Sequence, residues 1–249
     1  MRAVADYFSD VHARLLELEQ TQAAAIDAAA SLGATAILDR RPIHIFDTGH
    51  LISHEFIART GGLAAYTSLS FAATLEQENQ WVAAERGQLD PSGGTSTRLL
   101  VEWLFEQGTI RPGDPLILSS VSGTNALVVE LAQQARERGV SVVAVTGLGS
   151  SKQLVSNHSS GLRLFELADV VLDNCAPHGD AALVIEGLET PAAAWSGLAG
   201  AALMWAVTVG IIEKCLAAGT TQTVYTSYNL PGGGERYQAA RAQYRASGQ

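Results

Sequence analysis

Residues 115–125 read PLILSSVSGTN, and this stretch decides the fold. The apolar run at 115–119 predicts a buried β-strand, and residues 125–138 have the spacing of an amphipathic helix. A second apolar run follows at 140–145, which predicts two parallel strands joined by a crossover helix. Because strands and helices alternate along the whole chain, we expect an α/β protein whose mostly parallel sheet is covered on both faces.

The rest of the chain extends this alternation. Residues 4–38 have helical spacing and predict one or two helices, with a break expected near Gly33. Further strands are predicted at 42–46, 65–69, 170–172 and 223–226, and further helices at 53–58, 97–107 and from about Ala192 onward. We expect a single domain over residues 1–249, with an N-terminal helical extension over about 1–40 and a loop at 88–96.

Composition excludes several classes of protein. The chain has 249 residues, 47% of them hydrophobic and 16% charged, which does not fit a disordered protein. The net charge is −9, and the fourteen arginines and two lysines are scattered, so a nucleic-acid partner is not expected. Two cysteines without CxxC spacing and a charged N-terminal segment predict a cytoplasmic protein.

The most apolar stretch, residues 192–216, is long enough to suggest a membrane span. It contains Glu213 and Lys214 besides Ser196 and three glycines, so we expect a buried core helix and no membrane partner. Its alanines and glycines allow close helix packing, which predicts a homodimer or homotetramer.

Two polar turns follow predicted strands, where ligands of such sheets bind. The first is Asp47-Thr48-Gly49-His50 and the second spans residues 119–125, directly before a helix. Backbone N–H groups, the helix dipole and the hydroxyl groups of the second turn suit an anion, although simple N-capping is the alternative. The predicted substrate- or anion-binding residues are Thr48, Gly49, His50, Ser120, Ser122, Gly123, Thr124 and Asn125.

Residues 120–125 resemble the S-x-S-G-x-T phosphosugar-binding turn of the SIS (sugar isomerase) domain. Other segments between Ile43 and Tyr228 resemble uncharacterised phosphosugar-binding members of that family: Gly49-His50, RTGG at 59–62, HSSG at 158–161, ADVVLDN at 168–174 and GDA at 179–181. The resemblance implies a three-layer α/β/α sandwich around a Rossmann-like five-stranded parallel sheet. It also implies a sugar ligand with a terminal anion, in a dimer or tetramer whose active site borrows residues across the interface.

SIS proteins include aldose–ketose isomerases, an amidotransferase-linked isomerase, an ether-cleaving lyase and sensory modules of regulators, so the fold does not fix the chemistry. The N-terminal segment lacks the basic clustering of a DNA-binding regulator. We therefore expect an isomerase that acts on an anionic hexose through an enediol. A sensing module that does not turn over its ligand and a sugar-ether lyase are the alternatives.

An enediol isomerase needs a base near C1 and C2 and an acid or base that opens the ring. Glu55 lies where SIS isomerases commonly carry a catalytic carboxylate, and it is the predicted base, with a solvated helix face as its alternative role. His158, in the HSSG segment, is the predicted ring-opening or proton-shuttling group, or else a structural hydrogen-bonding residue. The competing carboxylates in the loop region are Glu76, Glu78 and Glu85.

No metal and no cofactor are predicted. His50 and His54 are four residues apart and with Glu55 offer a weak zinc pattern, but a third confirmed ligand is missing. Cys175 has no cationic neighbour in the sequence and is interpreted as a plain buried thiol.

The first turn departs from the usual G-x-G-x-S of SIS domains, because Asp47 replaces the first glycine and Leu51 replaces the final serine. In the second turn, Asn125 replaces the usual threonine. A carboxylate near the anion, without Lys or Arg in either turn, would repel a phosphate dianion more than a sulfonate. A 6-sulfo-sugar is therefore an alternative substrate, unless Asp47 turns away. The polar loops at 173–180 and 229–234 are predicted to line the sugar pocket or a subunit contact.

Overall fold

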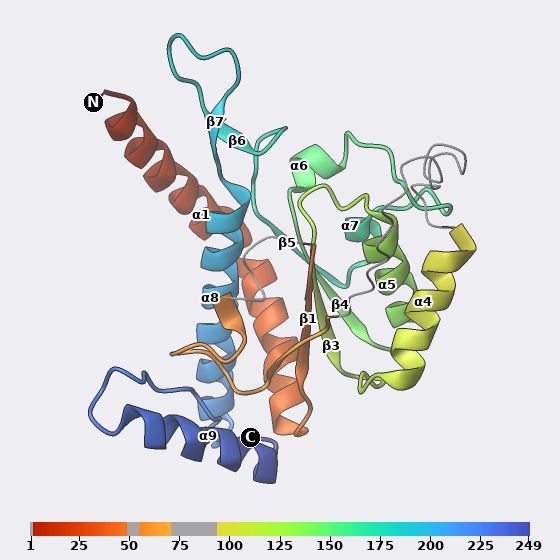
Figure 1. The fold of residues 1–249 in the computed structure, drawn as a ribbon, viewed down its shortest axis with the longest axis vertical. Helices are drawn as coiled ribbons and strands as arrows, with labels where there is room; N and C mark the ends of the chain where they lie inside the picture. Colours follow the sequence, from red (N-terminus) through yellow and green to blue (C-terminus); the bar gives the residue numbers. More distant parts are fainter. Residues whose placement is uncertain (1, 49–54, 71–93) are drawn as a thin grey trace, which may run out of the picture.

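The computed structural model describes residues 2–48, 55–70 and 94–249, and its centre is a five-stranded parallel sheet (Figure 1). The strands are β1 (Ile43–Asp47), β2 (Tyr66–Ser68), β3 (Pro115–Ser119), β4 (Ser141–Thr146) and β5 (Val170–Asp173). Their order in the sheet is β2-β1-β3-β4-β5, so the chain reverses its direction of winding between β1 and β3. Asp47 pairs in register with Ser119, and Ser119 with Val145, so these strands end at one edge.

Helices cover both faces of this sheet, as predicted. Helices α1 (Arg2–Leu38) and α8 (Ser196–Ala217) lie on one face, and α4 (Gly94–Gln107), α5 (Ala126–Glu137) and α7 (Leu164–Leu167) on the other (Figure 1). Strand β3 is buried throughout and divides its side chains between the two cores, with Ile117 facing α1 and α8 and Leu116 and Leu118 facing α5. The α/β prediction and the five-stranded parallel sheet are thereby confirmed.

Helix α1 continues through Gly33, so the expected break is wrong. A Cβ atom at Gly33 would lie within 2.8 Å of Ile211 Cγ1, and one at Gly210 would lie 2.9 Å from the Cβ of Ala30. Both glycines are therefore used for close packing between α1 and α8. The small residues of α8 serve, at least in part, contacts within the chain.

Helix α8 begins later than predicted, because residues 192–194 form strand β7 instead. Strand β7 (Ala192–Ala194) pairs antiparallel with β6 (Ala181–Leu183) in a hairpin that projects beside the N-terminal part of α1 (Figure 1). Asp180 fixes the start of α8, since its carboxylate accepts hydrogen bonds from Ser196 N and Ser196 Oγ, both at 2.7 Å. An acidic side chain at this end also complements the helix dipole.

Helix α8 is long and apolar enough to cross a membrane by length and composition, with a mean hydropathy of 1.5. Leu203, Val207 and Ile211 are buried in the core that α8 shares with α1 and the sheet. This packing is the one predicted for a core helix of an α/β protein.

The predicted strand at 223–226 is also wrong. Val224 forms one isolated antiparallel bridge with Leu63, because the segment it meets at 61–64 is a turn and not a strand. The chain then ends in helix α9 (Gly233–Ser247), where Tyr237 stacks on Tyr225 with ring centroids 4.6 Å apart. Of the loop expected at 88–96, residues 94–96 belong to α4 and the others lie outside the described residues.

Candidate functional site

A cavity of about 490 Å³ lies at the carboxyl edge of the sheet. Its described lining comes from the segments that follow β1, β3, β4 and β5. These residues are Thr48, Ser120, Val121, Ser122, Asn125, Ser150, Leu154, Pro177, His178, Gly179 and Asp180. A sheet of this strand order binds ligands at the switch point between β1 and β3, which is where Thr48 and the 120–125 turn meet.

The turn at 120–125, hereafter the anion cradle, ends as the N-cap of α5. Asn125 Oδ1 accepts a hydrogen bond of 3.0 Å from Leu127 N, so the capping role weighed for this turn is present at that residue. Gly123 has φ +62°, and a Cβ atom there would lie 2.9 Å from Ser151 Oγ. Backbone conformation and lack of space therefore both favour glycine at this position.

The serine hydroxyl groups of the cradle retain the ability to donate. Ser120 Oγ accepts a long hydrogen bond of 3.3 Å from Gly123 N, and Ser122 Oγ accepts one of 3.4 Å from Thr124 N. Ser122 Oγ also accepts from Thr124 Oγ1 at 3.1 Å. Because both serine oxygens act as acceptors here, their O–H groups are available to a ligand in the cavity.

Ser150 lies beside the cavity, on helix α6 (Leu148–Ser151). Its side chain is 5% exposed, and its Oγ has no hydrogen-bond partner within the described part of the chain. Buried hydroxyl groups are ordinarily hydrogen-bonded, so an unpaired hydroxyl group beside the cavity is unusual, although the Ser150 oxygen itself is buried and does not face the cavity.

The loop after β5 closes the cavity and contributes His178, which the sequence analysis did not single out. The Asp180 carboxylate is occupied by the N-terminus of α8, whereas the His178 side chain is exposed at the cavity. Histidine is the side chain that changes charge closest to neutral pH. His178 lies in the loop at 173–180, which was predicted to line the sugar pocket or a subunit contact, and that placement was the signal that could have identified it.

No lysine or arginine occurs among the described residues of the lining. An anion here would be held by the dipole of α5, by backbone N–H groups and by hydroxyl groups. Asp47, whose charge motivated the sulfonate alternative, is not part of the described lining either.

The structure does not bring His158 to this cavity. His158 lines a separate polar cavity of about 420 Å³ between α4 and α5, together with Glu130. Its Nε2 lies 2.7 Å from Glu130 Oε2, and its Nδ1 lies 2.8 Å from Ser160 Oγ. Both ring nitrogens are thus engaged within the protein, which is the structural hydrogen-bonding role weighed as its alternative.

Glu55 is half-buried, and its carboxylate pairs with Arg59 at 3.3 Å, one helical turn away. It is not among the described residues that line the cavity. The other first-turn predictions and the competing carboxylates lie outside the described residues: Gly49, His50, His54, Glu76, Glu78 and Glu85.

Within residues 2–48, 55–70 and 94–249, no three His, Cys, Asp or Glu side chains are arranged to hold a metal ion. The weak zinc pattern depends on His50 and His54, which are not described. Burial, followed by the nearby Asp173 carboxylate, raises the pKa of the Cys175 thiol, and burial raises that of Cys215. Raised pKa values are those of unreactive thiols.

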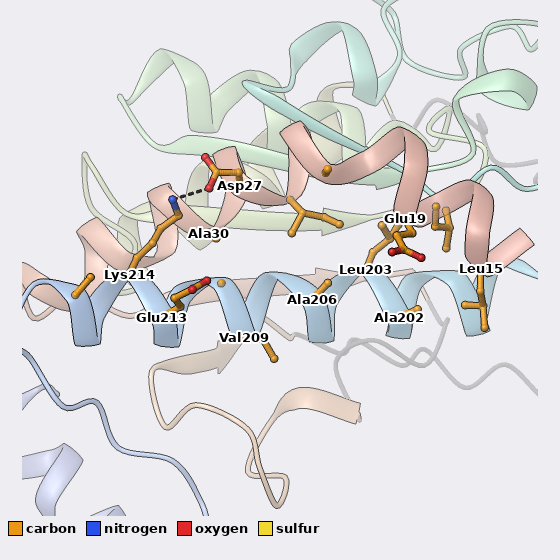
Figure 2. A pocket seen from close by; sticks show the side chains of 15 residues that line it. Leu15, Glu19, Asp27, Ala30, Ala202, Leu203, Ala206, Val209, Glu213 and Lys214 are labelled. Carbon is orange, nitrogen blue, oxygen red and sulfur yellow. Dashed lines mark ion pairs between the residues drawn. The ribbon is translucent and has the colours of Figure 1, made fainter.

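A third cavity, of about 650 Å³, is a groove between α1 and α8 (Figure 2). Figure 2 shows aliphatic side chains such as Leu15, Leu203 and Val209 along it, and the ion pair of Lys214 with Asp27, 2.6 Å long, at one end. This groove offers few polar groups for a sugar. The cavity at the sheet edge is therefore the candidate sugar site.

Comparison with known proteins agrees with the motifs. The sequence profile of the SIS domain matches residues 6–147, more than half of the chain. A UPF0309 protein of Oceanobacillus iheyensis is 32% identical over 238 residues, covering 94% of this chain and 93% of its own length. A UPF0309 protein of Brucella anthropi is 35% identical over 241 residues, covering 96% of this chain and 95% of its own.

Among solved structures, a phosphoheptose isomerase from Neisseria gonorrhoeae aligns with a TM-score of 0.54 at 20% identity, over 84% of this chain and 97% of that one. This likeness shows a shared fold. The resemblance inferred from residues 120–125 and the HSSG and ADVVLDN segments is confirmed. The chain belongs to the SIS domain family and, within it, to the UPF0309 proteins.

Proposed function

We propose that this protein is an aldose–ketose isomerase that acts on an anionic hexose, with the anion of the sugar held in the anion cradle. The observation that carries the proposal is the cavity where the cradle and His178 meet at the switch point of the sheet. Membership of the SIS family, and a fold shared with a phosphoheptose isomerase, support a function in sugar-phosphate binding or isomerisation.

The chemistry needs two proton transfers. A base takes the proton from C2 and returns it to C1, while a second group moves a proton between O1 and O2 of the enediol. We assign the first transfer to His178, because among the described residues of the lining it is the titratable side chain without a hydrogen bond or ion pair to the protein. Glu55, predicted from the sequence as the base, is kept in the proposal as the second group on that sequence argument alone, because its carboxylate pairs with Arg59 and it is not among the described residues of the lining.

The charge of the anion is part of the proposal. A phosphate monoester carries close to two negative charges at neutral pH and a sulfonate carries one. The described lining contains no lysine or arginine to balance the second charge. Both 6-phosphohexoses and 6-sulfo-sugars are therefore candidate substrates, and no cofactor is needed for either reaction.

The sensing-module alternative has one observation in its favour. The carboxylate of the described lining, Asp180, is occupied by Ser196 and is not available as a base. If no enzyme-catalysed exchange occurs at C2 of a bound sugar, the module is the better description.

Proton NMR in deuterated water, with a panel of phosphohexoses and 6-sulfo-sugars, separates these functions. An isomerase incorporates deuterium at C2 and forms the ketose, whereas a sensor raises the melting temperature without exchange. The lyase alternative needs a phosphohexose with an ether substituent, from which elimination releases the substituent as an alcohol and leaves an unsaturated sugar. We expect His178→Asn to lower the rate by roughly a hundredfold, the lower range for a general acid or base, with affinity retained. An unchanged rate in that variant would remove His178 from the mechanism.

A homodimer or homotetramer in the cytoplasm is also proposed, from the alanine- and glycine-rich surface of α8 and from the SIS family. Gly210 packs on Ala30 of the same chain. The remaining surface of α8, including the exposed Val209, is the part available to a second copy.

A further inference from the structure

The buried pair of Glu130 and His158 has no part in the proton transfers proposed above. Glu130 is 6% exposed and His158 is 9% exposed, and the 2.7 Å contact between Glu130 Oε2 and His158 Nε2 joins α5 to the loop between α6 and α7. Glu130 Oε1 also accepts a hydrogen bond of 2.6 Å from Gln134 Nε2, which holds the carboxylate in place.

The hydrogen bonds around His158 define which nitrogen carries the proton. Ser160 N donates to Nδ1 at 3.2 Å, so Nδ1 is an acceptor. The Nε2 proton is therefore the one donated to Glu130. The imidazole bridges two backbone elements, with one nitrogen turned toward its own loop and the other toward α5.

The loop that carries His158 holds the anion cradle from behind. Asn157 N donates a hydrogen bond of 3.0 Å to the carbonyl oxygen of Thr124, and Leu164 N donates one of 2.8 Å to the carbonyl oxygen of Gly123. These contacts fix the carbonyl groups of both cradle residues on the side of the loop at 157–164. Carbonyl oxygens directed at the ligand would repel an anion, so their orientation is part of the site.

We propose that the Glu130–His158 pair is a positioning device for the anion cradle: it ties the loop at 157–164 to α5, and the loop in turn sets the orientation of the Gly123 and Thr124 peptides. His158 is then a positioning residue and not a catalytic one. The inference deepens the proposed function, because it rests on the anion binding in the cradle that was proposed above.

Two substitutions of His158 distinguish its contact with Glu130 from its contact with Ser160. In His158→Asn, the amide reaches the Nδ1 position and keeps the contact with Ser160, but it is too short for Glu130. In His158→Gln, the longer amide reaches the Nε2 position and keeps the contact with Glu130. His44→Asn is a matched control, because His44 forms another buried histidine–carboxylate contact, 3.3 Å to Asp114, near the opposite ends of the strands.

Amide NMR with inorganic phosphate as the probe measures both parts of the proposal. Hydrogen exchange at Asn157 and Leu164 reports the loop without any ligand, and titration of the Gly123 and Thr124 signals reports phosphate affinity. We expect His158→Asn to raise both exchange rates and to weaken phosphate binding about tenfold, the loss of roughly one hydrogen bond to an ion. His158→Gln and His44→Asn should remain within about twofold of the wild type in affinity.

Each outcome is informative. Wild-type exchange rates and wild-type affinity in His158→Asn would overturn the positioning role while leaving the cradle intact. An equal loss of phosphate affinity in His44→Asn would mean that the loss in His158→Asn comes from general destabilisation. That result would also overturn the positioning role. Absence of phosphate binding in the wild-type protein would overturn the cradle as a phosphate site, and with it the effect of the pair on affinity, while the proposed function would stand only for a 6-sulfo-sugar. Faster exchange confined to His158→Asn would then show that the pair holds the loop at 157–164 without a phosphate site beside it.

Discussion

Replacing Gly123 with alanine tests the geometry of the anion cradle. Alanine in the left-handed region costs about 1–2 kcal/mol, and Gly123 has φ +62°. The new Cβ atom would also lie 2.9 Å from Ser151 Oγ and 3.2 Å from Thr146 Oγ1, and overpacking of this kind costs about 1–3 kcal/mol. We therefore expect Gly123→Ala to lower the free energy of unfolding by about 2–5 kcal/mol.

Gly139→Ala is the matched control, at the opposite end of α5. Gly139 has φ +71°, and the nearest atom to a new Cβ there is Pro112 Cβ at 3.6 Å, an ordinary contact. This variant should lose only the conformational part, about 1–2 kcal/mol. Urea denaturation followed by circular dichroism gives both values.

Ligand affinity completes the comparison, because only Gly123 belongs to the cradle. Gly123→Ala should weaken the binding of the preferred anionic sugar by at least about tenfold, through displaced backbone N–H groups, and Gly139→Ala should not change it. Equal stability losses in the two variants would refute the argument from close contacts. Unchanged affinity in Gly123→Ala would refute the role of this turn in anion binding.

Three further predictions concern groups outside the cradle. Burial lowers the pKa of His44, against an opposing effect of Asp114. Below about pH 6.5 the His44 side chain is therefore protonated in the unfolded chain while it is still neutral in the native protein. Stability should therefore fall as the pH drops from about 6.5, less steeply in His44→Asn than in the wild type, and parallel curves from urea titrations would contradict this. Because the pKa values of Cys175 and Cys215 are raised, both thiols should react slowly with a disulfide reagent at pH 7.5 until urea is added, and a fast native thiol would be inconsistent with their burial. Light scattering at micromolar concentration should give the mass of a dimer or tetramer. If α8 forms the subunit contact, Val209→Glu should lower that mass. A monomeric wild-type protein would contradict the oligomer proposal.

The central strands β3 and β4 were predictable because parallel strands buried on both faces are continuous apolar runs, whereas the β6–β7 hairpin was missed and the strand expected at 223–226 is absent. Residues 115–119 were predicted within their observed bounds. The helix predicted at 125–138 is observed at Ala126–Glu137, with Asn125 and Arg138 as its caps. The break predicted at Gly33 is wrong because glycine, which usually weakens a helix, is needed here: the absence of a side chain lets Ile211 approach. Local sequence contains no information on that tertiary contact.

The candidate site was predicted in part for a similar reason. Ser120, Ser122, Asn125 and Thr48 lie at the cavity because motif and strand ends coincide there. His158 was assigned to the chemistry from its motif, but the sequence could not reveal its partner, Glu130, which lies 28 positions away on the helix behind the cradle.

Isothermal titration of the wild-type protein with the sugars of the panel tests the central claim most directly. The account predicts that one phosphohexose or 6-sulfo-sugar binds and that the same sugar without its anion binds at least about a hundredfold more weakly. The double variant Ser120→Ala/Ser122→Ala, folded by circular dichroism, should lose at least about tenfold in affinity for the anionic sugar. Equal binding of the charged and uncharged sugars, or full affinity in the double variant, would contradict an anion site in this turn.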